Sequence, residues 1–166
     1  MKKIGLFLVV ISFLSCSKGK DSTIDPNLIG LWEISSELGI NDIPSVQNEG
    51  YERVTQFNFN MDGSFEFGSF IRNINSRSIL AYSQRYLGTY EIEGDRLNLT
   101  YDYWGAQPLD DQYGDLQSLD ELILVNENQL WSFTYSISDN QKIVFDYDPC
   151  GPAENCIDSS TLYRVD

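Results

Sequence analysis

Residues 51–72, YERVTQFNFNMDGSFEFGSFIR, decide the fold of this 166-residue chain. Apolar and polar side chains alternate on both sides of Asp62-Gly63, so that Phe57 and Phe59 share one face of their segment. Such alternation is typical of a strand with one buried face, and Asp-Gly tolerates the positive φ of a tight turn. The stretch therefore predicts a β-hairpin with strands at residues 51–60 and 64–72.

The same pattern continues on both sides of this hairpin. Alternating runs separated by turn residues predict further strands at residues 28–36, 79–92, 97–104, 121–125, 129–136, 142–148 and 161–165. Gly94-Asp95 and Asn126-Glu127-Asn128 supply turns between them. Consecutive strands with short connections favour a meander, which removes its edges by closing into a barrel. The sequence thus predicts an all-β domain over residues 28–166, an antiparallel up-and-down β-barrel of eight to nine strands.

Composition excludes several classes of function. The chain contains no histidine, which removes imidazole-activated nucleophiles and the usual His-ligated metal sites. A net charge of -14 repels nucleic-acid backbones, so nucleic acid is not an expected partner. Carboxylate-based hydrolysis stays open as an alternative, but no motif singles out a catalytic pair. The sequence therefore predicts a protein that is not an enzyme and carries no cofactor.

The first residues predict export. Lys2 and Lys3 precede an apolar run that ends at Leu14, and the small residue Ser15 lies directly before Cys16. This order is that of a secretory signal peptide over residues 1–15, and FLSC resembles the lipobox of bacterial lipoproteins. The resemblance implies that Cys16 carries acyl chains such as palmitate and becomes the mature N-terminus. A soluble secreted protein with a chance cysteine is the alternative.

Residues 16–27 are polar and without periodicity, which predicts a flexible tether between anchor and barrel. Acyl chains must hold the protein at the membrane, because the mature chain is strongly acidic. We expect it at the bacterial cell envelope, on the Gram-negative outer membrane. Within the tether, Asp21-Ser22-Thr23 resembles a short O-glycan acceptor motif, with Ser22 or Thr23 as the acceptor.

Two further cysteines, Cys150 and Cys156, are separated by five residues that include glycine and proline. In an exported chain their even number and close spacing predict a local disulfide bond. Closing so small a loop removes little chain entropy, about 2 kcal/mol before any strain.

Two long connections interrupt the predicted meander, at residues 37–50 and 105–120. Loops of this length in a compact domain are commonly lids or binding loops. The second is acidic, and Asp110, Asp111 and Asp115 offer oxygen ligands for Ca²⁺, although EF-hand spacing is absent. An acidic loop that is simply solvated is the alternative.

The residues Leu28-Ile29-Gly30-Leu31-Trp32 resemble the Gly-x-Trp opening of lipocalins. The stretches 57–65, 88–97 and 162–164 resemble, in order, the strands and turns of lipocalin-like bacterial lipoproteins. The resemblance implies that Trp32 closes one end of the barrel and packs against Arg164 of the last strand, with Gly30 beside them. A guanidinium on an indole face forms a cation–π contact, for which we expect a separation within about 6 Å.

An eight-stranded barrel is wide enough to be filled by side chains or to hold one small ligand. Alternation places Arg53, Phe57 and Phe59 on one face, and Tyr101 with Tyr103 on another. We expect these five residues to line the ligand site, with Arg53 receiving an acidic head group near the open end. For Arg53 a snorkelling or salt-bridged role is the alternative. The sequence thus predicts non-catalytic binding of a small, partly apolar ligand; a filled barrel that contacts an envelope protein through its long loops is the alternative.

Overall fold

The computed structural model describes residues 24–39, 50–106, 117–149 and 158–165. These form eight strands and one short 3₁₀ helix: β1 (Gly30–Glu37), β2 (Tyr51–Phe59), β3 (Ser64–Asn73), β4 (Ile79–Glu93), β5 (Arg96–Gly105), η1 (Leu119–Glu121), β6 (Ile123–Ser138), β7 (Lys142–Asp146) and β8 (Ser159–Arg164). No helix in this described part is long and apolar enough to cross a membrane. Cys16, Ser22, Thr23, Asp110, Asp111, Asp115, Cys150 and Cys156 lie outside the described residues.

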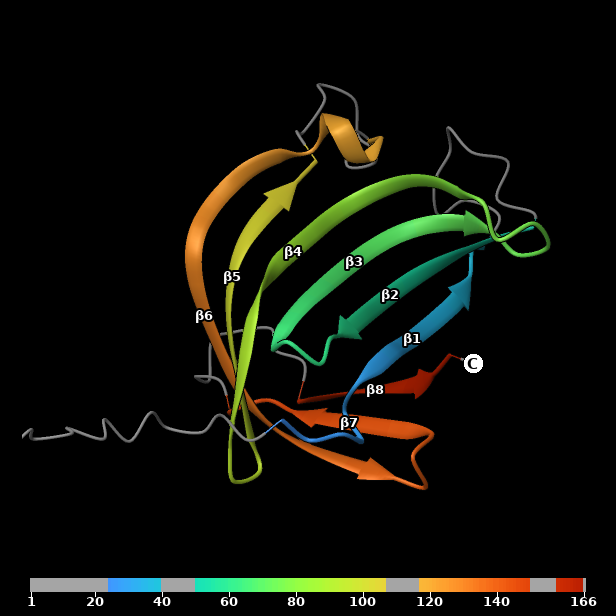
Figure 1. Cartoon of the computed structure of the whole chain (residues 1–166). Coiled ribbons are helices and arrows are strands. Elements are labelled where there is room, and N and C mark those ends of the chain that lie inside the picture. The colour runs from blue at the N-terminus through green and yellow to red at the C-terminus, as the bar shows by residue number, and fades with distance from the viewer. Residues whose placement is uncertain (1–23, 40–49, 107–116, 150–157, 166) are drawn as a thin grey trace, which may run out of the picture.

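The eight strands close a barrel in the order of the sequence, each antiparallel to the next, and β8 returns to β1 (Figure 1). This confirms the predicted all-β, up-and-down barrel. The hairpin predicted from residues 51–72 is present with β2 and β3 in unbroken register, and Gly63 takes a φ of 81° in its turn. Short turns and period-two patterning therefore suffice to specify most of the meander.

The prediction of two strands at residues 121–125 and 129–136 is wrong, because β6 runs unbroken through both. Asn128 has a φ of 50°, as the sequence suggested, but its backbone N–H donates to Asp102 Oδ1 (2.9 Å) on neighbouring β5. The pairing shifts there, from Tyr101 opposite Gln129 to Tyr103 opposite Asn126. The residues expected to form a turn therefore form a β-bulge.

The barrel wall is shorter between β6 and β1 than elsewhere. Strand β7 pairs with β6 only from Thr134 to Ser138, and β8 pairs with β1 only at Trp32 and Glu33. The start of β6 and the end of β1 consequently extend beyond β7 and β8 at one end, which Figure 1 shows above the two short strands. We call this the open end and the opposite one the closed end.

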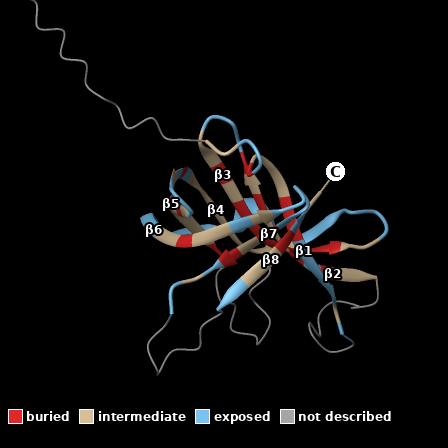
Figure 2. Cartoon of the chain, turned by 90° about the horizontal axis from the view of Figure 1, so that it is seen from below, coloured by how far each residue is buried: buried red, intermediate tan, exposed pale blue. Residues whose placement is uncertain are grey.

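The core fills the closed half of the barrel. Its fully buried side chains are large and mostly aromatic or branched: Leu28, Trp32, Phe57, Phe59, Leu97, Leu99, Phe133, Ile143, Phe145 and Leu162. Figure 2 shows the buried positions gathered toward the middle of the barrel, where β1, β7 and β8 lie. Ring contacts join the strands across this core; Phe57, for example, meets Phe67 at 4.7 Å and Phe145 at 5.3 Å between centroids.

Candidate functional site

At the closed end, the guanidinium of Arg164 packs on the indole ring of Trp32. Arg164 Cζ lies 4.3 Å from the centroid of Trp32, and its guanidinium donates to the carbonyls of Asn27 (2.5 Å), Ile29 (2.8 Å) and Asn140 (2.7 Å). Gly30 leaves the space for this, since a Cβ there would lie 2.8 Å from Arg164 Nη1. Its φ of 123° also favours glycine. The structure thus brings Gly30, Trp32 and Arg164 together.

The chain enters the barrel across this closed end. Trp32 Nε1 donates to the carbonyl of Leu28 (2.7 Å), and the Leu28 side chain is fully buried. The hydroxyl of Tyr135 on β6 donates to Oδ2 of Asp25 (3.1 Å). The backbone carbonyl of Asp25 in turn accepts from the N–H of Leu28 (3.0 Å). The segment before β1 is therefore fixed at the end of the barrel opposite the open one.

The strand register defines successive rows of inward-facing side chains between the two ends. One row runs across five strands through Trp32, Phe57, Phe67, Tyr86 and Tyr103. The next row toward the open end contains Ile34, Thr55, Ser69, Gln84 and Gly105, and the one beyond it contains Ser36, Arg53, Ile71 and Ala81. In these two rows polar side chains alternate with small or aliphatic ones, and Ile71, opposite Arg53, is 1% exposed.

A cluster of three tyrosines lines the interior beside the filled core. Tyr86 stacks on Tyr101 at 4.7 Å and on Phe67 at 4.5 Å, and Tyr103 meets Tyr86 edge-on at 5.2 Å. All three tyrosines are half-buried, whereas Phe57 and Phe59, which lie in the same two rows, are 2% and 0% exposed. We call Tyr86, Tyr101 and Tyr103 the tyrosine ladder. It forms one side of the interior, which we call the wall, and the two phenylalanines form the fully buried side, which we call the floor.

The hydroxyls of Tyr86 and Tyr101 are neutral hydrogen-bonding groups. Burial, with the neighbouring Tyr101 and Tyr103, raises the pKa of Tyr86 to about 12, and burial likewise raises the pKa of Tyr101. The Tyr86 hydroxyl donates to Gln84 Oε1 (3.1 Å). Among the described residues, the hydroxyls of Tyr101 and Tyr103 have no such partner. Half-buried phenols of this kind are available to water or to a ligand.

Gly88 shapes this wall. It lies opposite Tyr101 in the β4–β5 pair, and a Cβ at this position would be 1.9 Å from the carbonyl oxygen of Thr100. The close approach of the two backbones therefore requires glycine. Tyr101 lies beside this gap, with Phe65 at 6.4 Å on the far side of it. An aromatic ring placed next to an inward glycine is a usual way to fill such a gap in a sheet.

Arg53 occupies an inward-facing row near the open end, one row before Tyr51 and Asn73. The β1–β2 and β2–β3 registers are unbroken, so Arg53 lies on the same face of β2 as Phe57, as predicted from alternation. Its side chain is exposed, and among the described residues no carboxylate lies within ion-pair distance of it. The expectation of a salt-bridged Arg53 therefore finds no support in the part of the chain that the structure describes.

Charges are divided between the two faces of β1–β5. Seven carboxylates face outward: Glu33, Glu37, Glu52, Glu66, Glu91, Glu93 and Asp102. Along the inward-facing positions of these same strands, Arg53 is the one charged side chain. The interior of this acidic protein is thus shielded from its own carboxylates across five of its eight strands.

An ion-pair network on the outer face of β1–β3 was not foreseen from the sequence. Arg72 donates to both oxygens of Glu33 and, through Nε, to Glu52 Oε1 (2.6 Å). Arg77 reaches the same two carboxylates at 3.3 and 2.9 Å. Burial alone would raise the pKa of Glu33 and Glu52, but Arg72 at Glu33, and the Ser35 hydrogen bond followed by Arg72 at Glu52, lower both. This network belongs to the wall and points away from the interior.

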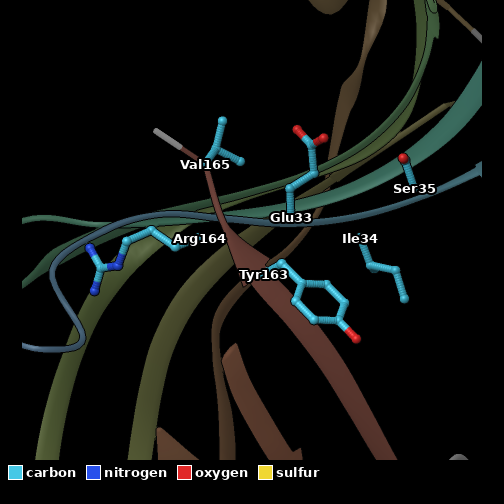
Figure 3. Close-up of a pocket in the computed structure, with 6 residues that line it drawn as sticks. All are labelled: Glu33, Ile34, Ser35, Tyr163, Arg164 and Val165. Atoms are coloured by element: carbon cyan, nitrogen blue, oxygen red, sulfur yellow. The ribbon is translucent and has the colours of Figure 1, made fainter. Parts of the chain in front are cut away.

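A hollow lies at the β1–β8 seam, with a volume of about 440 Å³ (Figure 3). Its lining is Glu33, Ile34, Ser35, Tyr163, Arg164 and Val165. In Figure 3, Ile34 points to the opposite side of β1 from Glu33 and Ser35, so the hollow wraps around the strand rather than entering the barrel. Its engaged arginine and shallow form make it a poorer ligand site than the open end.

Four of the five residues predicted to bind ligand face one interior and form two sides of it: Phe57 and Phe59 in the floor, Tyr101 and Tyr103 in the wall. Arg53 lies higher, toward the opening. The sequence argument missed Tyr86 and Gln84, although Tyr86 has the same parity in its strand as inward-facing Tyr90. No group of three or more potential metal ligands gathers within the described residues. The calcium ligands proposed from sequence, Asp110, Asp111 and Asp115, lie outside those residues.

Comparison with protein families places this geometry. The model of one family, described as a lipocalin-like domain, matches residues 28–124. The match runs from the segment of residues 24–29 before β1, which we call the strap, to the start of β6. A search of curated proteins found no match. The match covers more than half of the chain, and the closed eight-stranded meander agrees with it. The chain belongs to the lipocalin-like domain family.

Proposed function

We propose that this protein binds a small, partly apolar ligand at the open end of its barrel, without catalysis, while an N-terminal lipid anchor holds it at the bacterial cell envelope. The observation that carries the proposal is the tyrosine ladder, which is half-buried beside the fully buried Phe57 and Phe59. Such an arrangement combines apolar contact area with a few polar groups that orient a ligand. The lipocalin-like fold supports binding as the function.

A titration with the uncharged fluorescent probe N-phenyl-1-naphthylamine tests the binding proposal. We expect saturable binding to the wild-type protein and about tenfold weaker binding to Tyr103→Ala, because one wall of the pocket is removed. Tyr163→Ala is the matched control, since Tyr163 is 55% exposed and lines the seam hollow instead. Circular dichroism shows whether each variant keeps its fold.

Two results would contradict this assignment. Absence of saturable binding to the wild-type protein argues for a filled barrel without a ligand. Binding that is weakened by Tyr163→Ala and not by Tyr103→Ala moves the site to the seam hollow. Native mass spectrometry of protein purified from its own source then identifies a copurified ligand directly.

A second candidate function is supported by the apolar surface of β6. On the outer face of this strand Leu124 and Leu130, which lie opposite Trp104 and Thr100, are 43% and 81% exposed. Apolar side chains on a strand that extends beyond its β7 partner are a common feature of protein contact sites. In this alternative the barrel is an accessory protein that contacts an envelope partner. Leu130→Ser leaves probe binding unchanged but abolishes such a contact, which separates the two functions.

The proposed anchor fixes an orientation. Eight positions separate Cys16 from Ile24, where the described strap across the closed end begins. Extended chain spans at most about 3.5 Å per residue, so the closed end stays within about 30 Å of an acylated Cys16. The open end then faces away from the bilayer, and a ligand enters from the aqueous side. This arrangement favours a ligand with some solubility in water.

Acylation of Cys16 is tested by expression in a bacterial host that is fed labelled palmitate. We expect the wild-type protein to take up the label and to partition into the detergent phase of Triton X-114, because two or more acyl chains give stable membrane attachment. Cys16→Ala is expected to lose both properties, whereas Cys150→Ala keeps them. Wild-type protein that stays unlabelled in the aqueous phase contradicts the anchor.

A further inference from the structure

The proposed ligand site has a distinct electrostatic character, and this inference rests on the proposed function. We propose that its ligand is a small monoanion, such as a carboxylate, whose partly apolar body is rich in hydrogen-bond acceptors. Arg53 receives the anionic group near the opening, and the tyrosine ladder with Gln84 holds the body. An organic cation, by contrast, finds no counter-ion on the inward-facing positions of β1–β5.

The two faces of the barrel wall carry opposite charges. The inward-facing positions of β1–β5 carry Arg53 and no carboxylate, while seven carboxylates of these strands face outward. A cation drawn to the acidic surface finds no counter-ion on these inner positions. An anion that enters finds one guanidinium, whose planar group of donors matches a carboxylate. The interior therefore favours an anion, whereas the acidic outer surface attracts cations.

Arg53 has no acidic partner among the described residues and can therefore bind an anion. The other arginines in the described parts of the chain are already engaged: Arg72 and Arg77 with Glu33 and Glu52, Arg85 with Glu66, Arg96 with Asp148, and Arg164 with three backbone carbonyls. Arg53 is exposed on the inward face of β2 with no described acidic partner. An inward-facing arginine that forms no ion pair and is not packed in the core contributes little to stability. Its position therefore favours a role in binding a ligand.

Polar groups line the interior on the closed-end side of Arg53. Gln84 accepts from the Tyr86 hydroxyl with its amide oxygen, which leaves its amide N–H groups to donate. The hydroxyls of Tyr101 and Tyr103, which have no hydrogen-bond partner among the described residues, can donate as well. A ligand placed here meets donors along its length. Acceptors such as carboxylate, carbonyl or ether oxygens are therefore the complementary groups.

The spacing of the rows sets the size of the ligand. Arg53 and Phe57 are four residues apart on one strand, which is about 13 Å at 3.3 Å per residue. The ladder lies in the Phe57 row and the row below it. An Arg53 side chain that bends inward shortens this span by several ångströms. One or two fused rings with a carboxylate at one end fit between Arg53 and the ladder.

A pair of probes that differ in charge and not in shape tests this inference: 2-naphthoate and 2-naphthamide. We expect the wild-type protein to bind both, and Arg53→Gln to weaken 2-naphthoate about tenfold while 2-naphthamide changes less than twofold. Lys142→Gln is the matched control, because it removes one exposed positive charge from β7. It is expected to change neither affinity. Raising the salt concentration should narrow the difference between the two probes, since Arg53 is exposed.

The outcomes separate this inference from the proposed function. If Arg53→Gln leaves 2-naphthoate binding unchanged, or weakens both probes equally, the anionic ligand is overturned while binding at the open end stands. If N-phenyl-1-naphthylamine binds but 2-naphthoate does not, the same conclusion follows. If none of the three probes binds to the wild-type protein, both the inference and the proposed ligand site fail.

Discussion

Trp32→Ala is expected to lower the free energy of unfolding by about 3–5 kcal/mol, the usual cost of removing a large aromatic side chain from a core. Trp32 is fully buried, carries Arg164 on its face, and donates its indole N–H to the carbonyl of Leu28. Urea unfolding followed by circular dichroism measures the loss. Trp104→Ala is the matched control, because Trp104 is a half-buried tryptophan on the outer face of β5, and less than half of this loss is expected.

Variants of Trp32 and Arg164 distinguish the packing of Trp32 from its cation–π contact with Arg164. Arg164→Met keeps much of the aliphatic stem but removes the charge and three hydrogen bonds to backbone carbonyls. A double-mutant cycle with Trp32→Leu isolates the pair, for which we expect a coupling of about 1–2 kcal/mol. Coupling near zero would mean that Arg164 acts through the carbonyls of Asn27, Ile29 and Asn140 alone. It would also remove the cation–π explanation for the closed end.

The fold was largely predictable because its determinants are local. Alternation on both sides of Asp62-Gly63 specifies a hairpin, and one register slip would turn Phe57 and Phe59 outward. Every such strand and turn agrees with the closed meander that forms. The exception is β6, where Asn126-Glu127-Asn128 has the composition of a turn. In the bulge that forms instead, Asn128 N–H donates to Asp102 on β5, a partner 26 residues away that no local pattern contains.

The site was predictable only where it depends on alternation. Parity along β5 identified Tyr101 and Tyr103 as inward-facing, and parity along β2 identified Arg53. Tyr86 and Gln84 join them through the β4 register, which follows two pairing shifts near Ser69 and Ile71. The availability of Arg53 could not be foreseen at all. It depends on which carboxylates the other arginines contact, and those partners lie 19 to 52 residues away in the sequence.

Arg72→Met is expected to be as damaging as the loss of Trp32, at about 3–5 kcal/mol, because it leaves buried carboxylates without their main partner. Arg72, Glu33 and Glu52 are 5%, 9% and 7% exposed. Arg77 is 51% exposed and supplies longer contacts, so it compensates little. The matched control is Arg85→Met, which removes the same group from the more exposed Arg85–Glu66 pair and should cost at most about 1 kcal/mol.

The pH dependence of this loss identifies electrostatics as its cause. In the wild-type protein Arg72, with Ser35 at Glu52, Gln56 at Glu33 and Arg77 at both, holds the pKa of the two carboxyls below 4.5, so the network stabilises the fold above that pH and is lost as the pH falls through the lowered values. In Arg72→Met, burial is opposed only by the remaining groups, so both pKa values shift upward from those of the wild-type protein and protonation relieves the variant. The difference in stability between the two proteins should therefore narrow from pH 7 to pH 4. A difference that stays constant would assign the loss to packing of the Arg72 stem.

Replacing the whole network shows what it contributes. The triple variant Glu33→Gln, Glu52→Gln, Arg72→Met removes both carboxylates together with their partner, and we expect it to recover most of the stability that Arg72→Met loses. Because ion pairs taken out of water gain little net free energy, its stability at pH 7 should approach that of the wild-type protein. A triple variant as unstable as Arg72→Met would show that these three side chains hold β1, β2 and β3 in register by their specific geometry. That outcome would make the outer network, and not the aromatic core alone, a determinant of the wall from which Arg53 faces inward.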